Sequence, residues 1–272
     1  MSIVIHDIIC GSFCPRGASL QSLFPTQVVS HCLLVESNAG LVLIDTGVGR
    51  VLNQNPSAYL GHMNHFIYGM DRPSSVFTSA LEHVERLGYR AQDVRHIIPT
   101  HLDFDHCGDL SDFPEATIHV FERELVRAKN PSSLMDKQRY LAHALAHNPK
   151  YALYQQPSGE PWFGFDTVRS LQGVSDDILL IPLFGHTVGH TGVAVKGPNG
   201  WVLHAGDAYY QRVHLFERMS MMARLIRRRI DDDPEAAITN QKRLTTLIES
   251  DADVRVFCSH DPLECPGHSV PS

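Results

Sequence analysis

The stretch Thr100-His101-Leu102-Asp103-Phe104-Asp105-His106 is the most informative part of this chain, because it places four imidazole or carboxylate side chains within six residues. It follows the apolar run Val94 to Pro99, which predicts a buried strand. Where a strand gives way to a loop, side chains at alternate positions can point in one direction. We therefore expect positions 101, 103 and 105 to face one point and position 106 to reach a neighbouring one, so that one stretch serves two metal ions.

Three later motifs carry the same kinds of side chain directly after apolar segments. They are Gly185-His186-Thr187-Val188-Gly189-His190-Thr191, Gly206-Asp207-Ala208 and Ser259-His260-Asp261-Pro262. If the preceding strands run in the same direction, the loops that carry these motifs meet at one edge of the structure. There a carboxylate such as Asp207 can bridge two cations. Rigid strands are what hold such a cluster in place.

The remaining sequence predicts alternating strands and helices. Strands are expected at Ser2 to Ile9, Gln27 to Glu36, Gly40 to Asp45, Thr117 to Phe121, Ile178 to Leu183, Thr191 to Val195, Trp201 to Ala205 and Val254 to Cys258. Helices are expected at Ser79 to Leu87, Leu134 to His147, Glu217 to Ile230 and Asp233 to Ile248. The stretch Asn53 to Ser75 lacks clean periodicity and predicts a long surface excursion. Because both halves run strands, helix, strands, we expect one domain that forms a sandwich of two sheets with helices outside.

Composition narrows the possible functions. A formal net charge of −7 over 272 residues argues against a general affinity for nucleic acid or anionic membranes, since both attract basic surfaces. No apolar run is long enough for a transmembrane helix. The N-terminal MSIVIHDIICGSF has no basic region before its apolar stretch, so we expect no signal peptide and a cytoplasmic location. The six scattered cysteines are expected to be reduced, and Cys10 and Cys14 lack the second pair that a structural zinc site needs.

The ordered motifs HLDFDH, GHTVGHT, GDA and SHD, with the upstream Leu43-Ile44-Asp45-Thr46-Gly47, resemble those of the metallo-β-lactamase superfamily from Val29 to Pro262. The resemblance implies an α/β fold, the αββα sandwich. By position it implies a first metal site of His101, Asp103 and His186, a second of Asp105, His106 and His260, and Asp207 as the bridging ligand. Two divalent ions, zinc by default, can hold a hydroxide between them and polarise a carbonyl.

Asp103 departs from the family pattern, which has a second histidine at that position. A carboxylate is a harder ligand than an imidazole and carries a negative charge. We therefore expect a preference shifted toward Mn²⁺ or Fe²⁺, and a smaller effect of the metals on the pKa of bound water.

Several neighbouring residues are assigned supporting roles. Tyr210 resembles the tyrosine that N-acyl homoserine lactonases place beside the substrate carbonyl, and its phenol is expected to stabilise the developing oxyanion, with Tyr209 as the competitor for that position. Asp45 is expected to orient the ligand loop and His190 to be structural. The methionines of Glu217 to Ile230 either pack inward or flank the pocket mouth and accept an acyl chain.

Together these features predict a metal-dependent hydrolase of a small lactone or other carboxylic ester, with Asp105 and Tyr210 taking part in catalysis. A hydrolase of the same superfamily that acts on thioesters or β-lactams is one alternative. A mononuclear iron oxidoreductase, which the harder Asp103 brings closer, is another. A non-catalytic metal-binding module is the third, and self-association is left open.

Overall fold

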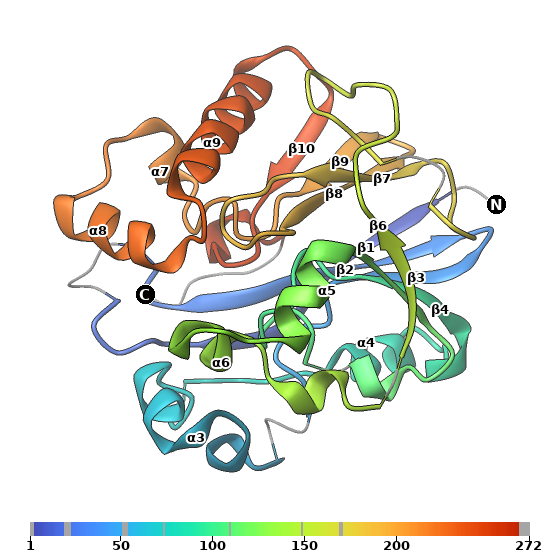
Figure 1. The fold of residues 1–272 in the computed structure, drawn as a ribbon. Helices are drawn as coiled ribbons and strands as arrows, with labels where there is room; N and C mark the ends of the chain where they lie inside the picture. The colour runs from blue at the N-terminus through green and yellow to red at the C-terminus, as the bar shows by residue number, and fades with distance from the viewer. Residues whose placement is uncertain are drawn as a thin grey trace.

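The computed structural model describes residues 3–18, 23–50, 54–72, 74–108, 110–147, 149–168 and 171–266. Two β-sheets pack face to face, and helices cover their outer sides (Figure 1). This layered arrangement confirms the predicted sandwich. The predicted strand start at Ser2 and the start of the predicted excursion at Asn53 lie outside the described residues.

The first sheet has six strands in sequence order: β1 (Val4–Phe13), β2 (Val28–Ser37), β3 (Gly40–Ile44), β4 (Val94–Ile98), β5 (Thr117–Phe121) and β6 (Lys150–Tyr154). The first three pair antiparallel, and each strand from β3 to β6 pairs with the next in parallel. The hairpin between β2 and β3 closes at Gly40, whose φ of 99° lies in the region that favours glycine. The chain therefore begins with three consecutive antiparallel strands.

The second sheet has the order β10 (Val254–Phe257), β9 (Gly200–His204), β8 (Thr191–Gly197) and β7 (Ile178–Pro182). β10 is parallel to β9, and β8 is antiparallel to both β9 and β7. It follows that β7, β9 and β10 run in the same direction. The three motifs that follow these strands thus leave the sheet at the same edge.

The core between the sheets follows from side-chain alternation along the strands. On β2, Leu33 and Val35 face the second sheet, where they join a cluster that includes Leu180 and Val193. Leu34, between them, faces the helices on the other side of the first sheet. The strands are therefore buried on both faces, which fixes the direction in which each loop leaves the sandwich.

The helices lie outside the two sheets (Figure 1). They are α3 (Pro56–Ile67), α4 (Ala80–Arg86), α5 (Glu122–Lys129), α6 (Leu134–Arg139), α7 (Val213–Phe216), α8 (Met221–Ile230) and α9 (Pro234–Glu249), with short 3₁₀ turns at Ala91–Asp93, Leu110–Asp112, Ala142–Leu145 and Pro262–Glu264. Asp233 caps α9 by accepting a hydrogen bond from the Ala236 amide, as the Asp-Pro pair predicted. None of the helices in the described parts of the chain combines the length and apolar character needed to cross a bilayer.

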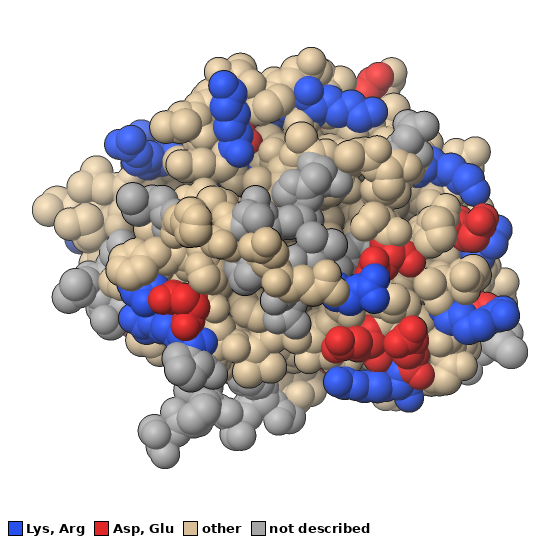
Figure 2. Space-filling model, turned by 90° about the horizontal axis from the view of Figure 1, so that it is seen from below, with Lys and Arg blue, Asp and Glu red and all other residues tan. Residues whose placement is uncertain are grey.

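The surface in Figure 2 carries acidic and basic side chains interspersed among uncharged ones. Among the described residues visible there, no continuous basic surface forms.

Two helix predictions were wrong in extent. The helix expected from Leu134 to His147 ends at Arg139, because Tyr140 adopts an extended conformation. The side chains of Arg139 and Tyr140 are both buried there. The helix expected from Glu217 begins later, at Met221, since the side chain of Ser220 caps it by accepting from the Ala223 amide.

Other elements were missed. The excursion predicted from Asn53 to Ser75 contains α3, whose periodicity is hidden by the kink at Gly61 and by the exposure of Phe66 and Ile67. The sequence also predicted neither α5 nor β6.

Candidate metal centre

Seven imidazole and carboxylate side chains meet where the loops leave the sandwich, and they form three overlapping groups with metal-ligand spacing. The loop after β4 supplies four of them and the loops after β7, β9 and β10 supply one each. Six are buried and the seventh, Asp105, is partly so. The members are His101, Asp103, Asp105, His106, His186, Asp207 and His260, so the structure brings all the predicted ligand positions together.

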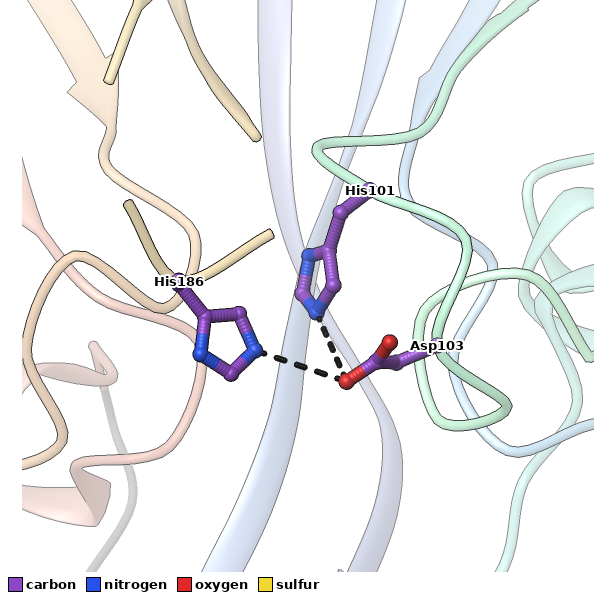
Figure 3. Close-up of side chains that lie close together, drawn as sticks. All are labelled: His101, Asp103 and His186. Carbon is purple, nitrogen blue, oxygen red and sulfur yellow. Dashed lines mark ion pairs between the residues drawn. The ribbon is translucent and has the colours of Figure 1, made fainter. Parts of the chain in front are cut away.

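The first group, here called the first cage, consists of His101, Asp103 and His186 (Figure 3), and one oxygen of Asp207 lies beside it. The Nε2 atoms of His101 and His186 each lie 3.4 Å from Asp103 Oδ2. Asp207 Oδ2 lies 4.0 Å from His101 Nε2 and 3.6 Å from His186 Nε2. Ligands around a tetrahedral ion with bonds of about 2.0–2.1 Å are roughly 3.4 Å apart. The first cage therefore has the size that a divalent ion needs.

The second cage consists of Asp105, His106 and His260, with the other oxygen of Asp207. Asp207 Oδ1 lies 3.4 Å from His106 Nε2 and 3.1 Å from His260 Nε2. The carboxylate of Asp105 lies 3.8 Å from His106 Nε2 and 3.6 Å from His260 Nε2. Asp207 Oδ2 also lies 3.2 Å from His260 Nε2, so the carboxylate lies between the two groups of ligands and within reach of both.

The hydrogen bonding of these atoms tests whether ions fit. Four of them are buried without a hydrogen-bond partner among the described residues: His101 Nε2, Asp103 Oδ1, His106 Nε2 and Asp207 Oδ1. Buried polar atoms are nearly always satisfied in folded proteins. Cations in the two cages would give these atoms partners, so the side chains present fit the binding of divalent metal ions.

The protonation of the ligands reflects burial and the surrounding charges. Burial opposes the charged form of Asp103, but Arg139 and His101 outweigh it and hold the pKa of that carboxyl well below its usual value. Burial raises the pKa of Asp105. Burial also lowers the pKa of His101, to about 4, and the charge of His106 adds to that effect. The centre therefore combines carboxylates with imidazoles in close contact, the donor set that divalent transition metals bind.

Hydrogen bonds behind the cages aim the imidazoles. The Nδ1 atom of His106 lies 2.8 Å from Asp45 Oδ2, and that of His260 lies 2.8 Å from the carbonyl of Val29. Asp45 also accepts from the amide of Thr100 at 2.6 Å. Such contacts place the proton on Nδ1 and leave the lone pair of Nε2 for a metal. Asp45 thus contacts the ligand loop as predicted.

His190 lies behind the first cage, in the supporting position that the sequence indicated. Its Nε2 accepts from the amide of Asp207 at 2.9 Å, and its Nδ1 lies 2.9 Å from the carbonyl of Leu183. Both ring nitrogens are therefore engaged within the protein, and the imidazole fixes the backbone that carries Asp207.

Three charged residues at the centre were missed by sequence reasoning. Arg139 Nε donates to Asp103 Oδ2 at 3.0 Å, and Asp231 Oδ1 lies 3.3 Å from His186 Nδ1. Glu124, fully buried, accepts from the amides of Leu102 at 3.1 Å and Gly189 at 2.9 Å. None of these residues lies in a recognisable motif, so the sequence carried no signal for them.

The two adjacent tyrosines point in different directions. Tyr210 lines the cavity beside the cages, and its hydroxyl lies 3.2 Å from His186 Nδ1. The hydroxyl of Tyr209 donates to the carboxylate of Glu264 at 3.0 Å. Of the two, Tyr210 is therefore the one that faces the candidate centre.

A cavity of about 170 Å³ opens onto the cages. Its walls are mostly apolar and aromatic and include Phe13, Phe24, Ile67, Tyr68, Phe104 and Met135. A larger cavity of about 630 Å³ lies between α7, α8 and α9 and contains none of the seven cage residues. Met219 and Met221 line this second cavity, whereas Ile230 is the α8 residue at the first one. The hypothesis that these methionines flank the mouth of the metal-side cavity was therefore wrong.

Known proteins resemble this chain in sequence and in fold. The family model of the metallo-beta-lactamase superfamily matches residues 25–260. A probable metallo-hydrolase of Mycobacterium tuberculosis is 37% identical over 264 residues, which cover 96% of this chain and 81% of the relative. An N-acyl homoserine lactonase of Bacillus thuringiensis is 25% identical over 232 residues, which cover 85% and 80%.

A solved structure of an N-acyl homoserine lactone hydrolase, with the product N-hexanoyl-L-homoserine bound at its catalytic metal centre, has a TM-score of 0.69 to this chain. The match covers 96% of this chain and 94% of that one, at 20% identity. This likeness confirms the predicted α/β sandwich.

Proposed function

This chain belongs to the metallo-β-lactamase superfamily of metal-dependent hydrolases, and on that premise we propose that it uses a two-metal centre to hydrolyse a lactone or other carboxylic ester. The position of Asp207 supports the proposal most directly, because its carboxylate lies between the two cages at the end of an apolar cavity. The lactonase among the relatives supports the substrate class.

In this proposal each cage holds one divalent ion, and Asp207 is shared between them. The first ion binds His101, Asp103 and His186, and the second binds Asp105, His106 and His260. Zinc suits the mixture of imidazole and carboxylate ligands, with manganese or iron as alternatives. When bound, the two ions supply Lewis acidity toward the ester carbonyl and lower the pKa of a water molecule.

The chain's own residues perform the remaining tasks. The apolar walls of the cavity bind the acyl part of the substrate, and the volume of about 170 Å³ suits a small ring or a short ester. Burial raises the pKa of Tyr210 well above its usual value, so its phenol stays protonated and donates a hydrogen bond to the developing oxyanion. Asp105 accepts the proton of the attacking water and returns it to the leaving alkoxide.

The experiment that tests this function combines elemental analysis with a substrate panel. Purified protein is loaded with zinc, manganese or iron and assayed against N-acyl homoserine lactones, simple lactones, aryl esters, thioesters and β-lactams at fixed enzyme concentration. We expect two ions per chain and fastest turnover on lactones or esters. Faster thioester or β-lactam cleavage would replace the substrate class, and oxygen consumption without ester turnover would replace the reaction.

A variant pair connects the activity to the cages. Asp207→Asn removes the oxygen that one cage requires and should reduce both metal content and turnover. Asp177→Asn, at a position outside both cages, is the matched control and should leave both unchanged. Protein that takes up none of the three metals would refute the proposed function.

A further inference from the structure

A single buried guanidinium contacts two of the three side chains that define the first cage. Arg139 is 6% exposed, and its Nε donates to Asp103 Oδ2 at 3.0 Å. Its Nη1 donates to the carbonyl of His186 at 3.2 Å. Its Nη2 lies 3.2 Å from Nδ1 of His186 and 2.8 Å from Nε2, the ring nitrogen that faces the first cage. All three nitrogens of Arg139 are thus engaged by residues of the centre.

The fold determines where this guanidinium lies. Arg139 is the last residue of α6, which starts at a capping box in which Ser133 and Asp136 exchange hydrogen bonds. The chain leaves the helix at Tyr140, whose side chain is also buried. A second carboxylate, that of Asp232, lies 4.0 Å from Arg139 Nη1. The position of the charge is therefore built into α6 and its surroundings.

The charges of Asp103 and Arg139 cancel. Asp103 is 8% exposed, so water screens the interaction between the two groups only weakly. The oxygen that Arg139 contacts, Asp103 Oδ2, is also the one nearest His101 Nε2 and His186 Nε2, so a cation in the first cage would share this carboxylate with a guanidinium. The pair therefore presents zero net charge to that cation, as a neutral imidazole does.

We propose that Arg139 lowers the affinity of the first cage for divalent ions by offsetting the charge of Asp103, so that the two side chains act as one ligand group of zero net charge. In this role Arg139 acts on the metal ligands Asp103 and His186, although its side chain also lines the metal-side cavity. The inference rests on the proposed function in one respect, namely that the first cage holds an ion. The sequence led us to expect a metal preference shifted toward Mn²⁺ or Fe²⁺ because of the negative charge of Asp103. Since Arg139 neutralises that charge, we now expect this shift only in variants that lack Arg139.

A purely structural role for Arg139 predicts the opposite result. If the guanidinium only holds Asp103 and His186 in place, its removal loosens two ligands and weakens metal binding. If charge compensation dominates, its removal exposes the ion to a full carboxylate and strengthens metal binding. The direction of the change in affinity therefore separates the two explanations.

The test is a double-mutant cycle on metal binding, measured without substrate. Four proteins are compared: wild type, Arg139→Met, Asp103→His and the double variant. Each is stripped of metal and titrated with Zn²⁺ and Co²⁺ against a chromophoric chelator. The Co²⁺ absorption spectrum is a second readout. The second cage gives the other binding step and is the internal reference. His260→Gln, which removes a ligand of the second cage, assigns the two steps.

The expected changes concern the first-cage step alone. Changes behind a metal ligand typically alter affinity about 10-fold to 100-fold. We expect Arg139→Met to lower the Kd of the first cage by about 10-fold or more and Asp103→His to raise it by a similar factor, since it leaves a buried cation unpaired. The double variant should return close to wild type, and Arg139→Lys, which keeps the charge, should also remain close to it.

Each outcome decides the question. Weaker or unchanged first-cage binding in folded Arg139→Met would overturn the proposal, as would effects of the two substitutions that simply add. If Arg139→Met does not fold, the comparison of Asp103→His with Asp103→His/Arg139→Gln decides, because rescue by the second substitution is expected only from charge compensation. Two bound ions with coupled effects but no ester turnover would refute the proposed substrate class alone. Two bound ions with ester turnover but no coupling would refute this inference alone.

Discussion

Replacing Asp45 by asparagine should release the ion of the second cage although Asp45 is not among the proposed ligands. Asp45 is 1% exposed, and its Oδ2 lies 2.8 Å from His106 Nδ1. Burial opposes its ionisation, but the nearby histidines, His106 foremost, keep the pKa of the carboxyl below its usual value. An ionised carboxylate accepts hydrogen bonds and cannot donate them. His106 therefore donates from Nδ1, which leaves Nε2, 3.4 Å from Asp207 Oδ1, as the nitrogen that would bind a metal.

Asparagine reverses this arrangement. Its carbonyl oxygen retains the 2.6 Å hydrogen bond from the Thr100 amide, which places the NH₂ group where Oδ2 faced His106. Two donors cannot pair, so the proton moves to Nε2 and occupies the lone pair that a metal requires. We expect the Kd of the second cage to rise by roughly 10-fold to 100-fold, or about 1.4–2.8 kcal/mol. This range also matches the cost of about 1–3 kcal/mol for an unsatisfied buried polar group.

The assay is a metal titration against a chelator, with thermal unfolding as the check on folding. Asp231→Asn is the matched variant, because Asp231 Oδ1 lies 3.3 Å from His186 Nδ1 and the same exchange there acts on the first cage. Asp45→Asn should thus change one binding step and Asp231→Asn the other. Wild-type Kd values for both steps in folded Asp45→Asn would refute the tautomer argument.

Three further predictions concern the supporting structure. Tyr210→Phe should lower kcat on the best ester by about 10²-fold to 10³-fold without loss of metal. Tyr209→Phe should keep kcat and lower the free energy of unfolding by about 1.5–3 kcal/mol. Kinetics, elemental analysis and urea unfolding check both variants. Gly206→Ala should lower the free energy of unfolding by more than about 1 kcal/mol, because φ is 55° and the added Cβ lies 2.5 Å from His190 Nε2; an unchanged urea midpoint would contradict this. Burial, with a smaller effect of a neighbouring histidine, lowers the pKa of His119 from 6.5 to about 3, so its contribution to stability is fully present above pH 6.5 and is lost as the pH falls toward 3. His119→Gln should therefore reduce the slope of unfolding free energy against pH below 6.5 by up to about 1.4 kcal/mol per pH unit, and equal slopes in urea titrations of both proteins would argue against it.

The strands other than β6 could be predicted because their apolar runs are continuous and end at recognisable turns. α5 could not, because its buried face contains Glu124 beside Leu125 and Ala128, and a carboxylate on that face hides the helical period. Glu124 is buried because it accepts from the amides of Leu102 and Gly189, 22 and 65 residues away in the chain. A local pattern contains no information about partners at that distance.

The proposed ligands could be predicted because their signal is local in the sequence. Each lies in a short motif directly after a strand. The choice between Tyr209 and Tyr210 required the structure, because it depends on which way the backbone turns after β9. Arg139 lay inside a predicted helix that in fact ends at that residue. Its partners, Asp103 and His186, are 36 and 47 residues away in the chain.

The early end of α6 and the composition of the first cage are connected. The loop after β4 of the first sheet provides Asp103, and the loop after β7 of the second provides His186. Arg139 contacts both, so it joins the two halves of the sandwich at the cage. A helix continuing through Tyr140 would carry the backbone past this point, and the buried Asp103 would lose the cation that compensates it, at a cost of about 3–5 kcal/mol for breaking a buried pair. The contact between one carboxylate and one guanidinium therefore accounts for the place where the local helix pattern fails.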